Sequence, residues 1–183
     1  DRLYNIKMNL SPLDLIQTNS SSRLIRLMDE YGVKHSFIQF EITETVATEY
    51  NSALNKAVDD FADSGIGLCL DDFGSGYANL NTVMQLPFSA IKLDRSLLNK
   101  ICEDPRSANF YHSIVSSFQN MGFHVISEGV ETADEVKLLS DYGVDMIQGF
   151  YFSKPLPSEK LLDLLEKSYS SKERHHICHY CLH

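Results

Sequence analysis

The sequence predicts an α/β fold in which short strands alternate with helices. Three observations lead to this prediction. Six short apolar segments alternate with longer segments whose apolar residues recur at helical spacing. The strand segments are apolar along most of their length, as in parallel strands covered on both faces. Each strand segment has a polar residue at its end or directly next to it. The predicted strands are 4–9, 36–42, 66–70, 89–93, 123–127 and 145–149.

Helices are expected in the segments between these strands. In the first, Ser20–Ser22 offer helix caps, apolar residues follow at helical spacing, and Gly32 closes the helix. The second contains Ala53, Leu54, Ala57, Val58 and Phe61 and is closed by Gly65. The remaining helices are expected in a short piece ending near Pro87 and at about 107–121, 132–142 and 158–169.

Two layouts accommodate six parallel βα units. A (β/α)8 barrel takes about 250 residues, so a chain of 183 residues would be a barrel without about two N-terminal units. An open, doubly wound sheet of six strands fits the count equally well. No Gly-rich phosphate loop follows the first strand, which weakens a nucleotide-binding doubly wound fold.

Composition restricts the classes of function. The chain is 43% hydrophobic and 22% charged, which is typical of one globular domain. A formal net charge of −9 disfavours DNA binding through a basic surface, and a phosphate ligand would need a bound cation to offset its charge. No apolar run approaches the roughly 18 residues of a membrane span. The start lacks a signal pattern and an initiator Met, so we expect a piece of a longer protein.

The polar residues at the strand ends form a candidate site, because the carboxyl ends of barrel strands converge on one face. Their oxygen donors suit Mg²⁺ or Mn²⁺, and the lack of His and Cys at these positions argues against zinc. A doubled aspartate suits two ions, which can stabilise the attacking and leaving oxygens of a displacement at phosphorus. Lys92 could orient a water or neutralise phosphate charge, and Glu128 could act as a base. In chain order these residues are Asn9, Glu41, Asp71, Asp72, Lys92, Glu128 and Gln148.

Each of these residues also has an ordinary structural interpretation. A single Asn or Glu after a strand is commonly a helix cap, and Asp94 is expected to cap the turn that starts at Ser96. Glu44 and Glu131 suit the first turn of a helix, where the macrodipole favours acids. The site hypothesis therefore depends on the whole set arriving in register.

Seven short motifs, in this order, resemble the EAL domain family, the cyclic di-GMP phosphodiesterases of bacteria. The resemblance spans residues 1–168. The motifs are Asn9-Leu10-Ser11, Phe40-Glu41-Ile42-Thr43-Glu44, Asp71-Asp72-Phe73-Gly74-Ser75-Gly76-Tyr77, Leu86-Pro87, Ile91-Lys92-Leu93-Asp94, Glu128-Gly129-Val130-Glu131-Thr132, and Gln148-Gly149 with Lys154-Pro155-Leu156.

The resemblance implies a (β/α)8 TIM-like barrel that hydrolyses cyclic di-GMP to linear pGpG with two Mg²⁺ or Mn²⁺ ions. It implies that Lys92 contacts the catalytic water and that Glu128 is a base or a ligand of the second metal. The implied metal ligands are Asn9, Glu41, Asp71, Asp72 and Glu128, and the implied substrate or water contacts are Gln148, Asp94 and Pro155.

The family resemblance also implies partners. Segment 73–80 would be a mobile loop that orders the metals and forms homodimer contacts, with Gly74 and Gly76 giving it backbone freedom. Glu44 would anchor this loop and Glu131 would support the site. The parent protein would be a cytoplasmic or membrane-anchored signalling protein, fused to a sensory or GGDEF domain and acting in processes such as biofilm formation.

Two alternatives to an active EAL phosphodiesterase stay open, and the sequence departs from the family pattern in several places. The glutamate that names the family would lie before residue 1, together with an Arg-containing substrate segment, so residues 1–183 alone are expected to have little activity. Ala78-Asn79 and Ser127 replace the usual serines and alanine. A degenerate EAL domain that binds cyclic di-GMP or dimerises without turnover is one alternative. An unrelated Mg²⁺-dependent barrel enzyme acting on a carboxylate or sugar phosphate is the other.

The last segment, 169–183, lies outside the family pattern and is expected to be a disordered tail. It is rich in residues that could instead bind a soft metal: His175, His176, Cys178, His179, Cys181 and His183.

Overall fold

The computed structural model describes residues 6–11, 15, 19–43, 52–76 and 80–163. Six parallel strands form one sheet in which the spatial order is the chain order. This arrangement is that of consecutive βα units in a barrel, so the predicted barrel-type α/β fold is confirmed. The strands are β1 (Ile6–Asn9), β2 (Ile38–Thr43), β3 (Gly67–Phe73), β4 (Ala90–Leu93), β5 (His124–Ser127) and β6 (Met146–Ile147).

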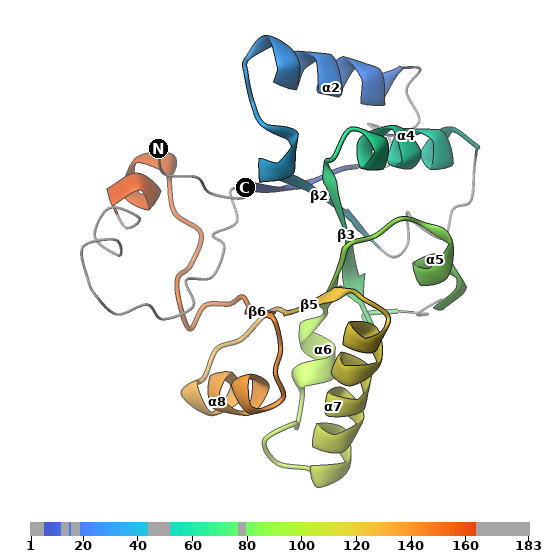
Figure 1. Ribbon diagram of the computed structural model, residues 1–183. Helices are drawn as coiled ribbons and strands as arrows, with labels where there is room; N and C mark the ends of the chain where they lie inside the picture. Colours follow the sequence, from blue (N-terminus) through green and yellow to red (C-terminus); the bar gives the residue numbers. More distant parts are fainter. Residues whose placement is uncertain (1–5, 12–14, 16–18, 44–51, 77–79, 164–183) are drawn as a thin grey trace.

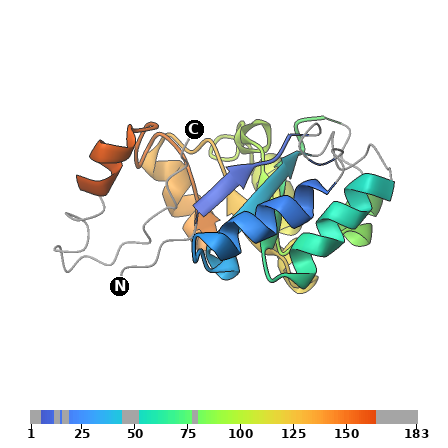
Figure 2. The same ribbon diagram turned by 90° about the horizontal axis from the view of Figure 1, so that it is seen from above.

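Helices cover the outer side of the curved sheet (Figure 1), and the view from above shows the same layering (Figure 2). Residues 158–163 are also helical. Among the described residues, no helix has the length and apolar character needed to cross a membrane. The elements are α2 (Ser20–Glu30), the 3₁₀ turn η1 (His35–Phe37), α4 (Ser52–Asp63), α5 (Leu80–Gln85), α6 (Arg95–Leu98), α7 (Pro105–Asn120) and α8 (Ala133–Asp141).

Alternation along the strands divides the sheet into an outer apolar face and an inner face that carries charge. Successive side chains of a strand point to opposite faces. In β3, Leu68 and Leu70 belong to the large core shared with the helices, whereas Cys69 belongs to a small inner cluster with Ala90 and Ile126. Because the inner cluster is small, the inner face has room for the charged groups at the strand ends.

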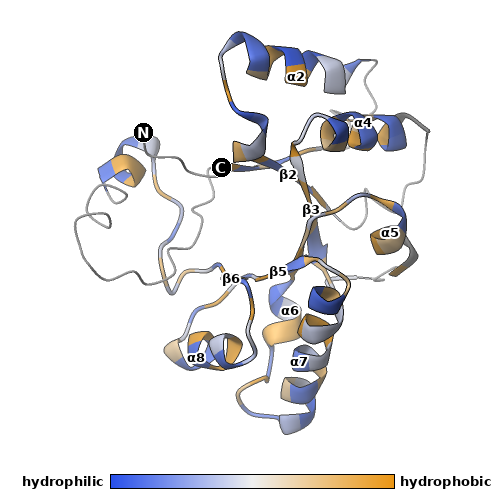
Figure 3. Ribbon diagram, viewed as in Figure 1, coloured by the Kyte–Doolittle hydropathy of each residue, from blue (hydrophilic) through white to orange (hydrophobic). Residues whose placement is uncertain are grey.

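Packing of α4 illustrates how the outer core forms. Leu54, Ala57, Val58 and Phe61 recur at helical spacing and are all buried. Phe61 packs on Phe40 of β2 with ring centroids 4.8 Å apart. Burial of one such side chain contributes about 1.5–3 kcal/mol. Figure 3 shows both hydrophilic and hydrophobic residues on the helices, as expected for helices with one face toward a sheet.

Several predicted boundaries are wrong, and the starts of α2 and α7 have an identifiable local cause. Asn19, with a left-handed φ of 62°, occupies the N-cap position of α2 without a side-chain capping bond, so Ser20–Ser22 lie inside the first turn. Helix α7 starts at Pro105 because Asp104 accepts hydrogen bonds from the backbone N–H groups of Arg106 and Ser107. Strand β3 continues to Phe73, and β6 has only two residues.

Gly149 lies where two backbone segments meet after β6. A Cβ at this position would collide with the backbone N, C and O atoms of Val130. Glycine is therefore required here by close approach. Gly76, by contrast, would place a Cβ in open space.

We expect Gly149→Ala to lower the free energy of unfolding by about 1–3 kcal/mol, since overpacked backbone must shift. Gly76→Ala is the matched control and should leave stability nearly unchanged. Urea unfolding of both variants checks this, and equal midpoints for Gly149→Ala and the wild type would contradict it.

Candidate functional site

A β-bulge at the end of β3 brings two consecutive carboxylates to the same place. Leu70 pairs with Ile91 and Phe73 pairs with Leu93, so two aspartates lie opposite the single residue Lys92. Asp72 adopts a left-handed backbone with φ of 58°, and its N–H donates to Asp71 Oδ1 at 3.0 Å. The bulge overrides the alternation that would otherwise send the two side chains to opposite faces.

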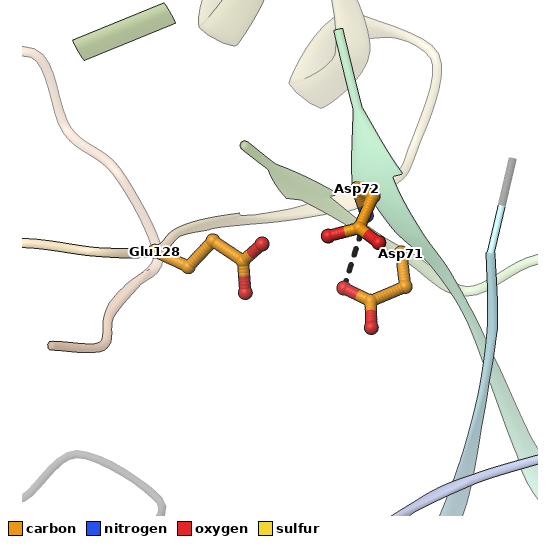
Figure 4. A group of neighbouring side chains, drawn as sticks. All are labelled: Asp71, Asp72 and Glu128. Atoms are coloured by element: carbon orange, nitrogen blue, oxygen red, sulfur yellow. Dashed lines mark hydrogen bonds between the residues drawn. The ribbon is translucent and has the colours of Figure 1, made fainter. Parts of the chain in front are cut away.

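Glu128, which directly follows β5, completes a group of three carboxylates. One oxygen each from Asp71, Asp72 and Glu128 lies within 4.8 Å of the others (Figure 4). This is a hard oxygen donor set of the kind that Mg²⁺ and Mn²⁺ prefer.

Lys92 lies at the centre of the acidic residues. Its Nζ is 2.7 Å from Asp71 Oδ1, 2.9 Å from Glu128 Oε2 and 3.3 Å from Glu41 Oε2. The lysine side chain is only 4% exposed. One ammonium therefore joins carboxylates from the three strand ends β2, β3 and β5.

Burial and charge crowding shift the pKa values in this cluster. Burial raises the pKa of Glu128 to about 7, and Lys92 only partly offsets this. Burial also raises the pKa values of Glu41 and Asp72, with Asp71 adding to both. Burial lowers the pKa of Lys92, but the surrounding Asp71, Glu128 and Glu41 carboxylates together raise it above its usual value. The lysine therefore stays charged, while one positive charge is too little to balance the acids.

Backbone and side-chain bonds fix the position of Glu128. Its N–H donates to Leu93 O at 3.2 Å, which ties the loop after β5 to the end of β4. On the outer face, the buried Tyr111 hydroxyl donates to Ser127 Oγ at 2.8 Å. Ser127, one of the departures from the family pattern, thus has a partner in α7 that holds the strand end under Glu128.

The structure brings five of the predicted site residues together, namely Glu41, Asp71, Asp72, Lys92 and Glu128. Asn9 ends β1 opposite Glu41 in the strand register, but its side chain is exposed. Gln148 follows β6, and its N–H donates to Ser127 O at 2.8 Å. Asp94 caps α6 by accepting from Ser96 N–H at 2.9 Å, which confirms the cap interpretation. Pro155 is exposed.

The predicted loop-supporting residues have different environments. Gly74 has a left-handed φ of 96° and packs against Leu97, so glycine is required at this position. A Cβ at Gly76 would meet open space, so no close approach requires glycine there, and its contribution to loop freedom stays a prediction. Glu131 is half exposed and pairs with Arg95 at 3.1 Å. Glu44 and residues 77–79 lie outside the described residues.

Two residues near the site escaped the sequence interpretation. Lys7 is buried in β1, and its charge lowers the pKa of Glu41. It lies two residues before Asn9 and therefore on the same face of β1, a spacing that could have indicated an inner-face lysine. Arg95, which pairs with Glu131, follows the Lys92-Leu93-Asp94 motif directly.

Known proteins are similar to this chain in sequence and in fold. RocR, a cyclic di-GMP phosphodiesterase of Pseudomonas aeruginosa, is 33% identical over 87% of this chain and 41% of its own length. The chain spans less than half of the length of the curated relatives that it matches, for example 41% of RocR and 17% of YkoW. Four of these relatives are named as cyclic di-GMP phosphodiesterases, and YkoW of Bacillus subtilis is named as a signalling protein.

Solved structures agree with the sequence comparison. The P. aeruginosa MucR phosphodiesterase in complex with cyclic di-GMP has a TM-score of 0.77 at 29% identity, covering 86% of this chain and 64% of that one. BlrP1 of Klebsiella pneumoniae in complex with manganese and cyclic di-GMP has a TM-score of 0.75 at 28% identity, covering 81% and 38%. The EAL domain profile matches residues 1–155. The chain belongs to the EAL domain family.

Proposed function

We propose that this domain hydrolyses one phosphodiester bond of cyclic di-GMP to give linear pGpG, using two divalent cations. The observation that carries the proposal is the carboxylate cluster around Lys92 at the carboxyl ends of parallel strands, where barrel enzymes place their chemistry. Relatives named as cyclic di-GMP phosphodiesterases support the substrate.

The residues present fit a divalent cation. Asp71, Asp72 and Glu128 would hold one ion. Glu41 would contribute to binding the second ion, on the side of the site toward Asn9 in β1. Among the described residues, Glu41 Oε1 is buried without a hydrogen-bond partner, as expected for an oxygen that a cation would contact. A bound ion would polarise a phosphoryl oxygen and lower the pKa of a coordinated water. The manganese complex of BlrP1 supports this choice of metal.

Lys92 and Glu128 are proposed to move and balance charge in the reaction. Water adds through its oxygen to phosphorus, the bond from phosphorus to the 3′ oxygen breaks, and that oxygen gains a proton. Glu128 accepts a proton from the water as the general base. Lys92 remains charged and stabilises negative charge on the phosphoryl oxygens.

Further parts of the proposal concern partners. Leu80 and Met84 of α5 are exposed, next to the segment expected to form dimer contacts, and they support a homodimer on that side. MucR is named as a bifunctional cyclase and phosphodiesterase, and the matched region is 23% of it. We propose that sensory or GGDEF domains accompany this domain in the natural protein, and that the domain acts in the cytoplasm.

Metal-free protein should lose stability as pH rises. The folded pKa of Glu128, about 7, exceeds its ordinary value of 4.5, so the folded state binds more protons than the unfolded state between these values. The free energy of unfolding should therefore fall by about 3 kcal/mol from pH 4.5 to pH 8. Added Mn²⁺ should abolish this decrease in the free energy of unfolding, because a bound cation balances the ionised Glu128. Glu128→Gln should flatten the metal-free profile, and an unchanged slope in that variant would refute the assignment.

Turnover should depend on the aspartates of the bulge. Asp71→Asn and Asp72→Asn should each lower kcat for cyclic di-GMP at least about a hundredfold, because they remove metal-binding charge. The assay follows pGpG release by the natural full-length protein with Mn²⁺. Asp59→Asn, which changes an exposed acid of α4, is the control. Tight binding of cyclic di-GMP by the wild type without any pGpG release would favour the receptor alternative.

Lys92→Met should destabilise the fold as well as remove activity. Its loss leaves buried carboxylates without their partner, which costs about 3–5 kcal/mol at pH 7. Destabilisation should shrink at pH 5, where the carboxyls with raised pKa values take up protons. Lys137→Met is the control because its ion pair with Asp141 is exposed. Equal unfolding midpoints of the Lys92 and Lys137 variants would show that the buried pairing is unimportant.

A further inference from the structure

Arg95 joins the two loops that carry the reacting groups. It is the first residue of α6, three residues after Lys92 in the chain. Its Nη2 is 3.1 Å from Oε2 of Glu131, which lies three residues after Glu128. The ion pair therefore bridges the loop after β4 and the loop after β5.

A second contact lies between the ion pair and Glu128. Gly129 has a left-handed φ of 72°, and a Cβ built there would lie 2.6 Å from Arg95 Cβ and 2.9 Å from Arg95 Cδ. The backbone next to Glu128 therefore rests directly on the aliphatic stem of Arg95. Glycine at 129 and arginine at 95 form one packed unit.

Other bonds hold the far side of the same loop. Val130 N–H donates to Gln148 O at 3.1 Å. The N–H groups of Glu131 and Thr132 donate to the Glu135 carboxylate at 2.8 and 2.9 Å, which completes the capping box of α8. These bonds tie the loop to β6 and α8. The Arg95 contacts tie it instead to the strand that carries Lys92.

The ion pair is too exposed to serve mainly as a stabilising contact. Side chains of Arg95 and Glu131 are 41% and 50% exposed, and pairs of this kind contribute little to folding. The two residues of the ion pair each lie three positions after a residue of the 2.9 Å contact between Lys92 and Glu128, which points to a role in positioning that contact. Small misplacements of reacting groups reduce rates strongly even when the fold is intact.

We propose that Arg95 is a positioning residue, which with Glu131 and Gly129 sets the position of the Glu128 carboxylate relative to Lys92. The inference rests on the proposed function for its kinetic consequences. Its structural content concerns only where Glu128 is held.

The test uses Arg95→Ala, which removes stem and charge, and Arg95→Met, which keeps much of the stem. We expect Arg95→Ala to lower kcat for cyclic di-GMP about tenfold with KM changed less than about twofold. Arg95→Met should be affected less, because it still covers Gly129. Mn²⁺ affinity, measured by calorimetry, should fall several-fold in Arg95→Ala because Glu128 is a proposed ligand.

A matched control comes from the exposed Lys137–Asp141 pair of α8, which has the same separation of 3.1 Å. Lys137→Ala should match Arg95→Ala in unfolding midpoint but retain wild-type kcat and Mn²⁺ affinity. In a double-mutant cycle, Glu131→Gln should add little to Arg95→Ala.

Wild-type kcat and wild-type Mn²⁺ affinity in a folded Arg95→Ala variant would overturn the inference. If the wild type binds Mn²⁺ but shows no turnover, the proposed hydrolysis fails and the Mn²⁺ affinities alone decide the role of Arg95. If the wild type binds no Mn²⁺ and shows no turnover, both proposals are overturned.

Discussion

The buried ammonium of Lys92 is the contact on which the arrangement of the site depends. It makes ion pairs with acids from three strands and is almost fully shielded from water. Buried charges are tolerated only when they are paired and hydrogen-bonded. Burial raises the pKa values of Glu41, Asp72 and Glu128, repulsion from Asp71 adds to this, and one lysine offsets it only in part. This excess of negative charge makes the site receptive to a cation.

The parallel sheet supplies the setting for this contact. Its outer face packs against helices through large apolar side chains, whereas small residues such as Ala90 lie on the inner face below the charged groups. Alternation alone would place only one of two consecutive aspartates on the inner face. The bulge and the left-handed backbone of Asp72 place both there. Local backbone strain is thus linked directly to the geometry of the carboxylates.

Much of the fold and of the site was predictable from sequence, for identifiable reasons. Apolar segments ending in polar residues indicated the strands, and the order of the motifs indicated the family. The bulge was not predictable, because in the sequence Asp71 and Asp72 are simply two polar residues that follow an apolar segment. From sequence alone, Lys7 is expected to be a solvated charge. In the structure it is buried in β1, close enough to Glu41 for its charge to lower the pKa of that carboxyl. The proposed positioning role of Arg95 could not be predicted, because it depends on a contact between its side-chain stem and Gly129, more than thirty positions away in the chain.

We propose that the inner-face carboxylates around Lys92 form a cation site. Crystals of the protein soaked in Mn²⁺ and measured near the manganese absorption edge test this most directly. We expect an anomalous difference peak bounded by Asp71, Asp72 and Glu128, within coordination distance of at least two of these carboxylates. A well-ordered site without such a peak, with Lys92 still paired to all three of its acidic partners, would contradict it.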